Sequence, residues 1–228
     1  MWNPEGKLPA ISAPVLSLLA MLFAIGYVAL AAWGFGAWRA LLAEPARAGV
    51  CGALVLLAGA TPLCGCNLSA GEKSHGGNDW IFPFLLIAGL LMGFGSAWCD
   101  RRNFLTLGGN VVRYAGLSLF LIGCVLRVAS MLILGPRFSV WVAIQSDHRL
   151  QTTGLYRFVR HPSYTGAIFT LFGWAITFRS DIGILLAALM VLPLVRRMIA
   201  EEKLLIAVFG DEYTSYRERT WRLIPLVY

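Results

Sequence analysis

The sequence predicts an all-α fold: a polytopic transmembrane helical bundle of five or six spans with a C-terminal helical hairpin. Composition is the first reason, because 58% of the 228 residues are hydrophobic and 14% are charged, whereas soluble domains carry about 25% charged residues. Run length is the second reason, because several apolar runs reach the roughly 17–25 residues that a transmembrane helix needs. Together these observations indicate one integral membrane domain instead of two soluble ones.

The expected spans follow one another with short connections. The second and the fifth are about 16 residues long, or ~24 Å at 1.5 Å per residue, against a hydrocarbon core of ~30 Å. A five-span alternative makes residues 48–63 re-entrant and leaves the C-terminal half unchanged. The six apolar segments are residues 11–33, 48–63, 81–98, 113–134, 163–178 and 181–199.

The connections carry recognisable turn signals. Residues 64–80 are rich in glycine, serine and asparagine, which is typical of a loop. Residues 179–181 predict a tight turn whose serine or aspartate caps the next helix, so residues 163–199 form a helical hairpin. Gly210 is expected to end the following helix, and Asp211 to cap a short cytosolic helix. The first apolar run is longer than the h-region of about 7–15 residues in a cleaved signal peptide.

The net charge of +7 would suggest nucleic acid binding in a soluble protein. Here the basic residues lie at the ends of apolar spans, where they face membrane lipids and set topology, so no nucleic acid partner is expected. If six spans cross, the bias favours both termini and the 135–162 loop in the cytoplasm, at an inner or plasma membrane. That side carries Lys7, Lys73, Arg137, Arg149, Arg157, Arg160 and the basic C-terminal tail, and the other side carries Arg39, Arg47, Arg101, Arg102, Arg113 and Arg179.

The five cysteines predict neither a metal site nor a full set of disulfides. Cys51 and Cys124 lie within apolar runs and are expected in the core. Residues 64–66 form a single CxC, which lacks the further ligands that a metal site needs at defined spacing. The odd total argues against a disulfide framework.

The titratable residues are unevenly distributed. Residues 1–134 are mostly plain spans, about four in number, and residues 135–228 hold the hairpin and most of the ionisable groups. The two polar segments, 135–162 and 196–222, lie at the same end of the hairpin. We therefore expect the functional site at that membrane face.

The first polar segment contains the only His-Pro step of the chain. Pro162 suits the first turn of a helix, so His161 should lie just outside the N-terminus of the fifth span. Free backbone N–H groups at a helix start favour an anion such as a carboxylate, and Arg157 and Arg160 add positive charge. The alternative is that these arginines are interfacial anchors.

The second polar segment adds adjacent carboxylates at Glu201 and Glu202, with Arg197 on the same helical face as Glu201. Arg127 lies inside the fourth span, where it either faces the bundle interior and holds an anionic group or reaches toward the interface. Such groups suit a ligand with a cationic centre, an amine and a carboxylate. S-adenosylmethionine has this charge pattern. The charges of these residues are compatible with that cofactor but do not identify it. No soluble Rossmann signature is present.

Two motifs resemble a known family. TTGLYRFVRHPSYTG (152–166) and, after the hairpin, EEKLLIAVFGDEYTSYRER (201–219) are similar to the isoprenylcysteine carboxyl methyltransferase family, with the related phospholipid methyltransferases sharing the outline. The resemblance covers roughly residues 145–225. It implies an S-adenosylmethionine-dependent membrane methyltransferase whose cofactor lies in a pocket at the cytoplasmic face.

The resemblance also implies roles for individual residues. Arg197 and Glu201 would be catalytic, with Arg197 positioning the acceptor, and Arg127 and Arg196 would bind substrate; the register of Arg196 against Arg197 stays open. The residues implied to bind the cofactor are His148, Thr153, Gly154, Leu155, Tyr156, His161, Tyr164, Glu201, Glu202 and Tyr213, with Tyr216 in the same tail motif.

The expected acceptor is the carboxylate of a lipophilic or prenylated molecule, similar to isoprenylcysteine. Alternatives are a phospholipid amine, a small thiol, or an NADPH-dependent membrane reductase with a related helical core. A transporter or membrane scaffold would leave the two polar motifs unexplained. The sequence does not indicate an oligomeric state.

Overall fold

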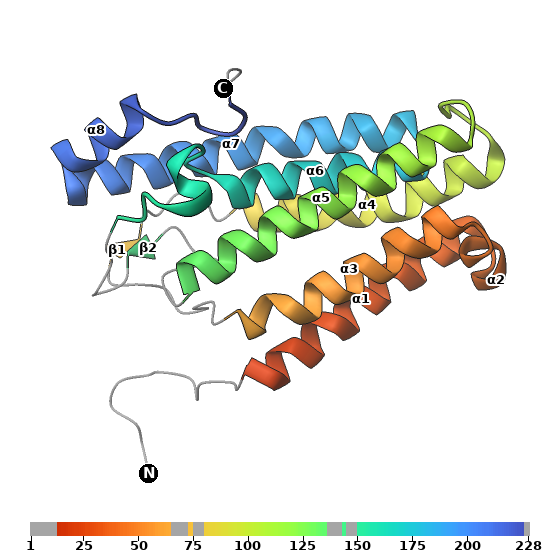
Figure 1. Cartoon of the computed structure of the whole chain (residues 1–228). Coiled ribbons are helices and arrows are strands. Elements are labelled where there is room, and N and C mark those ends of the chain that lie inside the picture. The colour runs from red at the N-terminus through yellow and green to blue at the C-terminus, as the bar shows by residue number, and fades with distance from the viewer. Residues whose placement is uncertain (1–12, 65–72, 75–79, 136–142, 145–149, 226–228) are drawn as a thin grey trace, which may run out of the picture.

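The structure, a computed structural model, describes residues 13–64, 73–74, 80–135, 143–144 and 150–225. Six long helices lie side by side along the described part of the chain (Figure 1). Their bounds are α1 Ala13–Phe35, α3 Pro45–Leu63, α4 Ile81–Arg102, α5 Asn110–Leu134, α6 Pro162–Thr177 and α7 Asp181–Phe209. The shorter elements are α2 Trp38–Leu42, the 3₁₀ turn Gly154–Arg157, α8 Asp211–Glu218, and the antiparallel strand pair β1 Lys73–Ser74 and β2 Ala143–Ile144.

The predicted all-α membrane bundle is confirmed. Five of the described helices, α1, α3, α4, α5 and α7, are long and apolar enough to cross a membrane. The segment expected to be re-entrant in the five-span alternative lies in α3, which has 19 residues and is one of the five. The helix that falls short is α6, with 16 residues.

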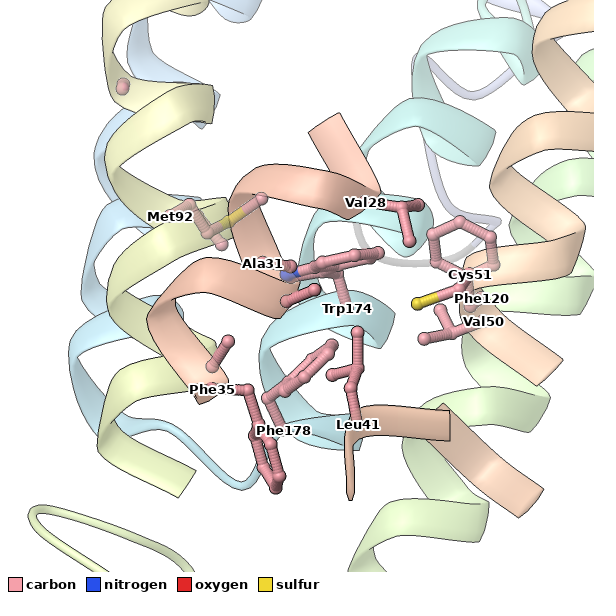
Figure 2. Close-up of a cluster of buried hydrophobic side chains, with 14 of the residues drawn as sticks. Val28, Ala31, Phe35, Leu41, Val50, Cys51, Met92, Phe120, Trp174 and Phe178 are labelled. Carbon is pink, nitrogen blue, oxygen red and sulfur yellow. The ribbon is translucent and has the colours of Figure 1, made fainter. Parts of the chain in front are cut away.

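Helix α6 is short because it is the inner helix of the bundle. None of its 16 residues is exposed. Figure 2 shows Trp174 of α6, and Phe178 directly after this helix, surrounded by apolar residues of α1, α2 and α3 and by Phe120 of α5. A helix with half of its residues buried and none exposed has little need to match the thickness of the lipid core.

Glycines bring α5 and α6 into close contact. A Cβ atom added at Gly123 of α5 would lie 2.7 Å from the carbonyl oxygen of Gly166 in α6, and one added at Gly173 would lie 2.6 Å from the backbone nitrogen of Phe120. Small residues allow such backbone approach in membrane helices. The contact fixes the N-terminus of α6 beside the C-terminal half of α5.

The hairpin formed by α6 and α7 follows the expected pattern. Ser180 caps α7 by accepting a hydrogen bond from the backbone nitrogen of Gly183 at 3.0 Å. Helix α7 has 29 residues, or ~43 Å at 1.5 Å per residue, so it continues past a membrane core of ~30 Å. Gly210, with φ 53°, ends it. The cap predicted at Asp211 is wrong by one residue: Gly210 is also the N-cap of α8, and Asp211 is the first helical residue.

Candidate functional site

The N-terminus of α6 and the C-terminal tail form one side of the candidate site. Pro162 is the first residue of α6 and His161 precedes it as N-cap, as the missing N–H of proline predicts. The backbone nitrogen of Arg160 donates to the carbonyl of Trp221 at 2.8 Å, and that of His161 donates to the carbonyl of Arg222 at 3.1 Å. Sequence reasoning missed this pairing, because the tail shows no strand pattern.

Glu202 is the centre of a buried polar cluster on this side. Its side chain is 4% exposed. Oε1 accepts a hydrogen bond from Nε of Arg160 at 3.2 Å, and Oε2 accepts one from Arg222 at 2.7 Å. Oε1 also lies 3.2 Å from Nε2 of His161. The Glu202 carboxylate therefore joins α7 to two other segments. One is the His161-Pro162 step at the start of α6, here called the entrance, and the other is the C-terminal tail that contains Arg222.

Glu201 lies in a different environment, one residue away on α7. Nε of Arg197 donates to the hydroxyl of Tyr164 at 2.8 Å, and this hydroxyl donates to Oε2 of Glu201 at 3.0 Å. The two residues implied to be catalytic are therefore joined through the tyrosine of the RHPSYTG motif. Arg196 points elsewhere, since its guanidinium lies 5.7 Å from the ring of Trp80, which directly precedes α4.

Three tyrosines surround these carboxylates. Burial, and after it the Glu201 carboxylate, raises the pKa of Tyr156 well above its usual value. Burial, and after it the Glu202 carboxylate, raises the pKa of Tyr213 in the same way. The hydroxyl of Tyr216 donates to the carbonyl of Tyr156 at 2.7 Å. The hydroxyl of Tyr213 is buried and has no hydrogen-bond partner among the described residues, so a neutral donor is present at the site.

Arg127 is half-buried between α5 and the start of α6. Its Cγ would be 2.7 Å from a Cβ added at Gly166, and its Nη1 lies 3.5 Å from the carbonyl oxygen of Ser163 at the start of α6. The side chain therefore extends from the middle of α5 toward the candidate site.

The turn before the entrance holds the next group of expected residues. Thr153 precedes the 3₁₀ turn, where its hydroxyl accepts a hydrogen bond from the side-chain amide of Gln151 at 2.7 Å. Gly154 has φ 63°, which suits glycine because it has no Cβ. Leu155 belongs to the turn, and His148 lies outside the described residues. In the described ranges, no group of three or more His, Cys, Asp or Glu side chains could hold a metal ion.

Comparison with known proteins shows that part of the chain is similar to one family. The profile of the "Isoprenylcysteine carboxyl methyltransferase (ICMT) family" matches residues 116–207. The chain is 34% identical over 121 residues to the protein-S-isoprenylcysteine O-methyltransferase of Schizosaccharomyces pombe, covering 52% of this chain and 51% of the relative. It is 40% identical over 77 residues to methanethiol S-methyltransferase 1 of Bradyrhizobium diazoefficiens, covering 34% and 26%. The chain spans about half the length of the curated relatives it matches.

A solved structure shares the fold. The eukaryotic intramembrane Ras methyltransferase ICMT superimposes with a TM-score of 0.51 at 19% sequence identity, covering 95% of this chain and 99% of the other. The similarity therefore includes the N-terminal helices, in which the sequence shows no motif. The chain is an isoprenylcysteine carboxyl methyltransferase (ICMT)-like integral membrane protein, related to that family through residues 116–207.

Proposed function

We propose that the protein is an S-adenosylmethionine-dependent membrane methyltransferase that methylates the carboxylate of a lipophilic, isoprenylcysteine-like acceptor. The observation that carries the proposal is the chain of hydrogen bonds from Arg197 through Tyr164 to Glu201. It joins a cationic group that suits an anionic acceptor to an anionic group that suits a cationic cofactor. Residues 135–228 would supply this machinery.

The residues present fit the cofactor. When bound, S-adenosylmethionine supplies an electrophilic methyl group on a sulfonium. Glu201 offers a half-buried carboxylate, and the electron-rich faces of nearby tyrosines favour cations as well. The buried hydroxyl of Tyr213 has no partner among the described side chains and backbone groups, and its raised pKa keeps it protonated. It can therefore donate a hydrogen bond to a ligand acceptor, as a buried polar group requires.

The acceptor needs binding and orientation more than activation. A carboxylate is ionised at neutral pH, so no general base is required. Arg197 would hold it by charge-assisted hydrogen bonds, with its guanidinium fixed in place by the hydroxyl of Tyr164. Catalysis then comes from alignment of the carboxylate with the methyl group and from exclusion of water. Arg127, which reaches the same end of α6 from α5, is a second candidate for contact with the acceptor.

The two adjacent glutamates would have different roles. Glu201 would contact the cofactor. Glu202 already accepts hydrogen bonds from Arg160 and Arg222 and contacts His161, so we infer that it is a positioning residue that fixes the entrance. His161 would act through the same cluster.

The acceptor would enter from the membrane, and the site would face the cytoplasm. The basic bias described above supports this orientation. It can be measured by cysteine labelling with a membrane-impermeant reagent in whole cells. A cysteine introduced at exposed Glu212 of α8 should react only after the cells are opened.

Cofactor binding tests the site directly. The purified protein in detergent is titrated calorimetrically with S-adenosylmethionine and, separately, with NADPH. We expect S-adenosylmethionine to bind and Glu201→Gln to weaken it at least tenfold. The matched control is Glu212→Gln, which removes an exposed carboxylate on α8 and should leave the affinity unchanged. Equal affinity for Glu201→Gln and the wild type, or binding of NADPH alone, would refute the proposal.

A second candidate acceptor has a specific observation in its favour. The relative from Bradyrhizobium diazoefficiens is named for methyl transfer to methanethiol. Transfer of labelled methyl from S-adenosylmethionine to a prenylcysteine, an ethanolamine lipid and methanethiol distinguishes the alternatives. Preference for the prenylcysteine, lost in Arg197→Gln, would support the carboxylate acceptor. A preference for methanethiol or the lipid amine would replace it.

A further inference from the structure

A second buried polar cluster lies at the opposite end of the helices, near α2 in Figure 1. Its centre is Asp100 of α4, whose side chain is 0% exposed. The carboxylate accepts hydrogen bonds from Arg47 of α3 at 3.0 Å, from Arg113 of α5 at 2.7 Å and from Arg179 at 2.9 Å. One carboxylate therefore faces three guanidinium groups, and the cluster keeps a surplus of positive charge.

The arginines of the cluster saturate the Asp100 carboxylate and also donate to the carbonyls of Ala40, Leu41 and Thr177. A carboxylate has about four lone-pair sites, and Asp100 receives five hydrogen bonds. Nε of Arg113 is buried without a hydrogen-bond partner in the described parts of the chain. A buried donor that lacks a partner is costly. The surplus positive charge of this cluster and its one unpartnered donor therefore favour a further anion.

Exposed arginines extend the cluster to the surface. The ring of Phe35 lies 4.4 Å from the guanidinium of Arg47 and 5.8 Å from that of Arg101, so it joins the buried cluster to an exposed arginine. Arg102 is exposed beside it, 5.9 Å from the ring of Trp98. This end of the helices carries Arg39, Arg47, Arg101, Arg102, Arg113 and Arg179 but only Glu44, Asp100 and Asp181 as acids.

The turn between α4 and α5 indicates that this end lies at the level of the lipid headgroups. Phe104 and Leu105 are each 50% exposed in this turn, and one residue, Asn103, separates them from the two arginines. Leu105 and Asn103 have φ of 46° and 53°. This left-handed region is common for asparagine but costs energy for a bulky residue such as leucine. Exposed apolar and aromatic side chains beside basic residues are typical of the membrane interface. The anion available there is the phosphate of a phospholipid.

We propose that this end of the protein binds the headgroup of an anionic phospholipid. Arg101 and Arg102 contact the phosphate, and the excess positive charge around Asp100 adds to the attraction. The apolar tip at Phe104 and Leu105 contacts the acyl chains of the same lipid. This site lies at the other end of the bundle from the proposed methyltransferase site and does not depend on its activity.

The proposal is tested by titrating the full chain in neutral detergent with short-chain phosphatidylglycerol and measuring the melting temperature. Short-chain phosphatidylcholine and inorganic phosphate are titrated in parallel. Phosphatidylglycerol should raise the melting temperature of the wild type, and the other two should not. R101Q/R102Q removes two charges that attract an anionic lipid surface and should weaken the apparent affinity about 30-fold, or about 2 kcal/mol.

The matched control is R217Q/R219Q, which removes two exposed arginines at the C-terminal end of α8, on the opposite side of the bundle, and should keep the wild-type affinity. A cooperative melting transition of R101Q/R102Q without added lipid reports that the variant is folded. The proposal is overturned if phosphatidylglycerol and phosphatidylcholine act alike, or if R101Q/R102Q keeps the wild-type affinity. An equal response to inorganic phosphate would show a site for soluble anions and would overturn the lipid assignment.

Discussion

Replacing Glu202 with glutamine should destabilise the fold, whereas the same change at Glu201 should not. Glu202 is 3% exposed and accepts charge-assisted hydrogen bonds from Arg160 and Arg222 at 3.2 and 2.7 Å. Removing one partner of a buried ion pair costs about 3–5 kcal/mol, because the other partner keeps an uncompensated charge. Glutamine keeps the size of the side chain and one acceptor oxygen, so we expect about 3 kcal/mol. For a chain of this length that lowers the melting temperature by about 6–12 °C.

The assay compares the melting temperatures of wild type, Glu202→Gln and Glu201→Gln in the same detergent, with S-adenosylmethionine titrations of each. Glu201 is only half-buried, and its Tyr164 partner can donate to a glutamine oxygen as well. We therefore expect a stability loss below about 1 kcal/mol for Glu201→Gln together with a large loss of cofactor affinity. Adjacent carboxylates of identical chemistry thus serve as controls for each other.

Either of two results would refute this reasoning. If Glu202→Gln melts at the wild-type temperature, the Glu202 carboxylate does not hold the start of α6 and the C-terminal tail together. If the two variants lose stability and affinity in parallel, the glutamates do not have separate roles. Restoring the charge with Glu202→Asp should recover part of the stability, because one methylene less lengthens the hydrogen bonds without removing them.

The remaining predictions concern four other features of the chain. Tyr164→Phe removes the hydroxyl that joins Arg197 to Glu201. The rate of methyl transfer should fall at least tenfold while the melting temperature stays nearly unchanged. An unchanged rate would contradict this positioning role. Asp100→Asn leaves three arginines without their carboxylate and should lower the free energy of unfolding by about 3 kcal/mol or more, measured by thermal denaturation; wild-type stability would contradict it. Truncation after Glu218 removes the carbonyls that pair with the entrance, so cofactor affinity should be lost while membrane insertion persists, and retained affinity would contradict a structural tail. Burial raises the pKa of Tyr216 to about 12 from 10.0; because the unfolded chain then loses its proton first, stability should fall as pH rises from about 10 toward 12, and Tyr216→Phe should show a smaller fall.

The sequence predicted most of the fold because helix formation in a membrane depends on local properties. Apolar runs, the glycine at 210 and the polar turn at residues 179–181 are each visible in a short window of sequence. The order of helices and the position of the hairpin follow from such windows. The cap at Asp211 was wrong by one residue because Gly210, with positive φ, both ends α7 and begins α8.

The candidate site could be predicted only in part. The motifs named the residues, and the structure brings His161, Tyr164, Arg197, Glu201 and Tyr213 to one end of the α6–α7 hairpin. Two features were beyond the reach of sequence reasoning: the tail that pairs with the entrance, and the connection of Arg197 to Glu201 through Tyr164. Both join segments that lie tens of residues apart, and no periodicity reports which distant side chains meet.

By itself, the sequence determined a helical membrane protein with a polar site at one end of its last hairpin, because hydrophobicity and turn chemistry act within a few residues. Only the tertiary structure decided that Glu202 is enclosed by arginines and that its neighbour Glu201 accepts a hydrogen bond from a tyrosine. It also decided that the short helix α6 is the inner one, and that Asp100 gathers three arginines at the far end. Helical rotation of 100° per residue sends adjacent side chains to different neighbours, and those neighbours are set by how the helices pack.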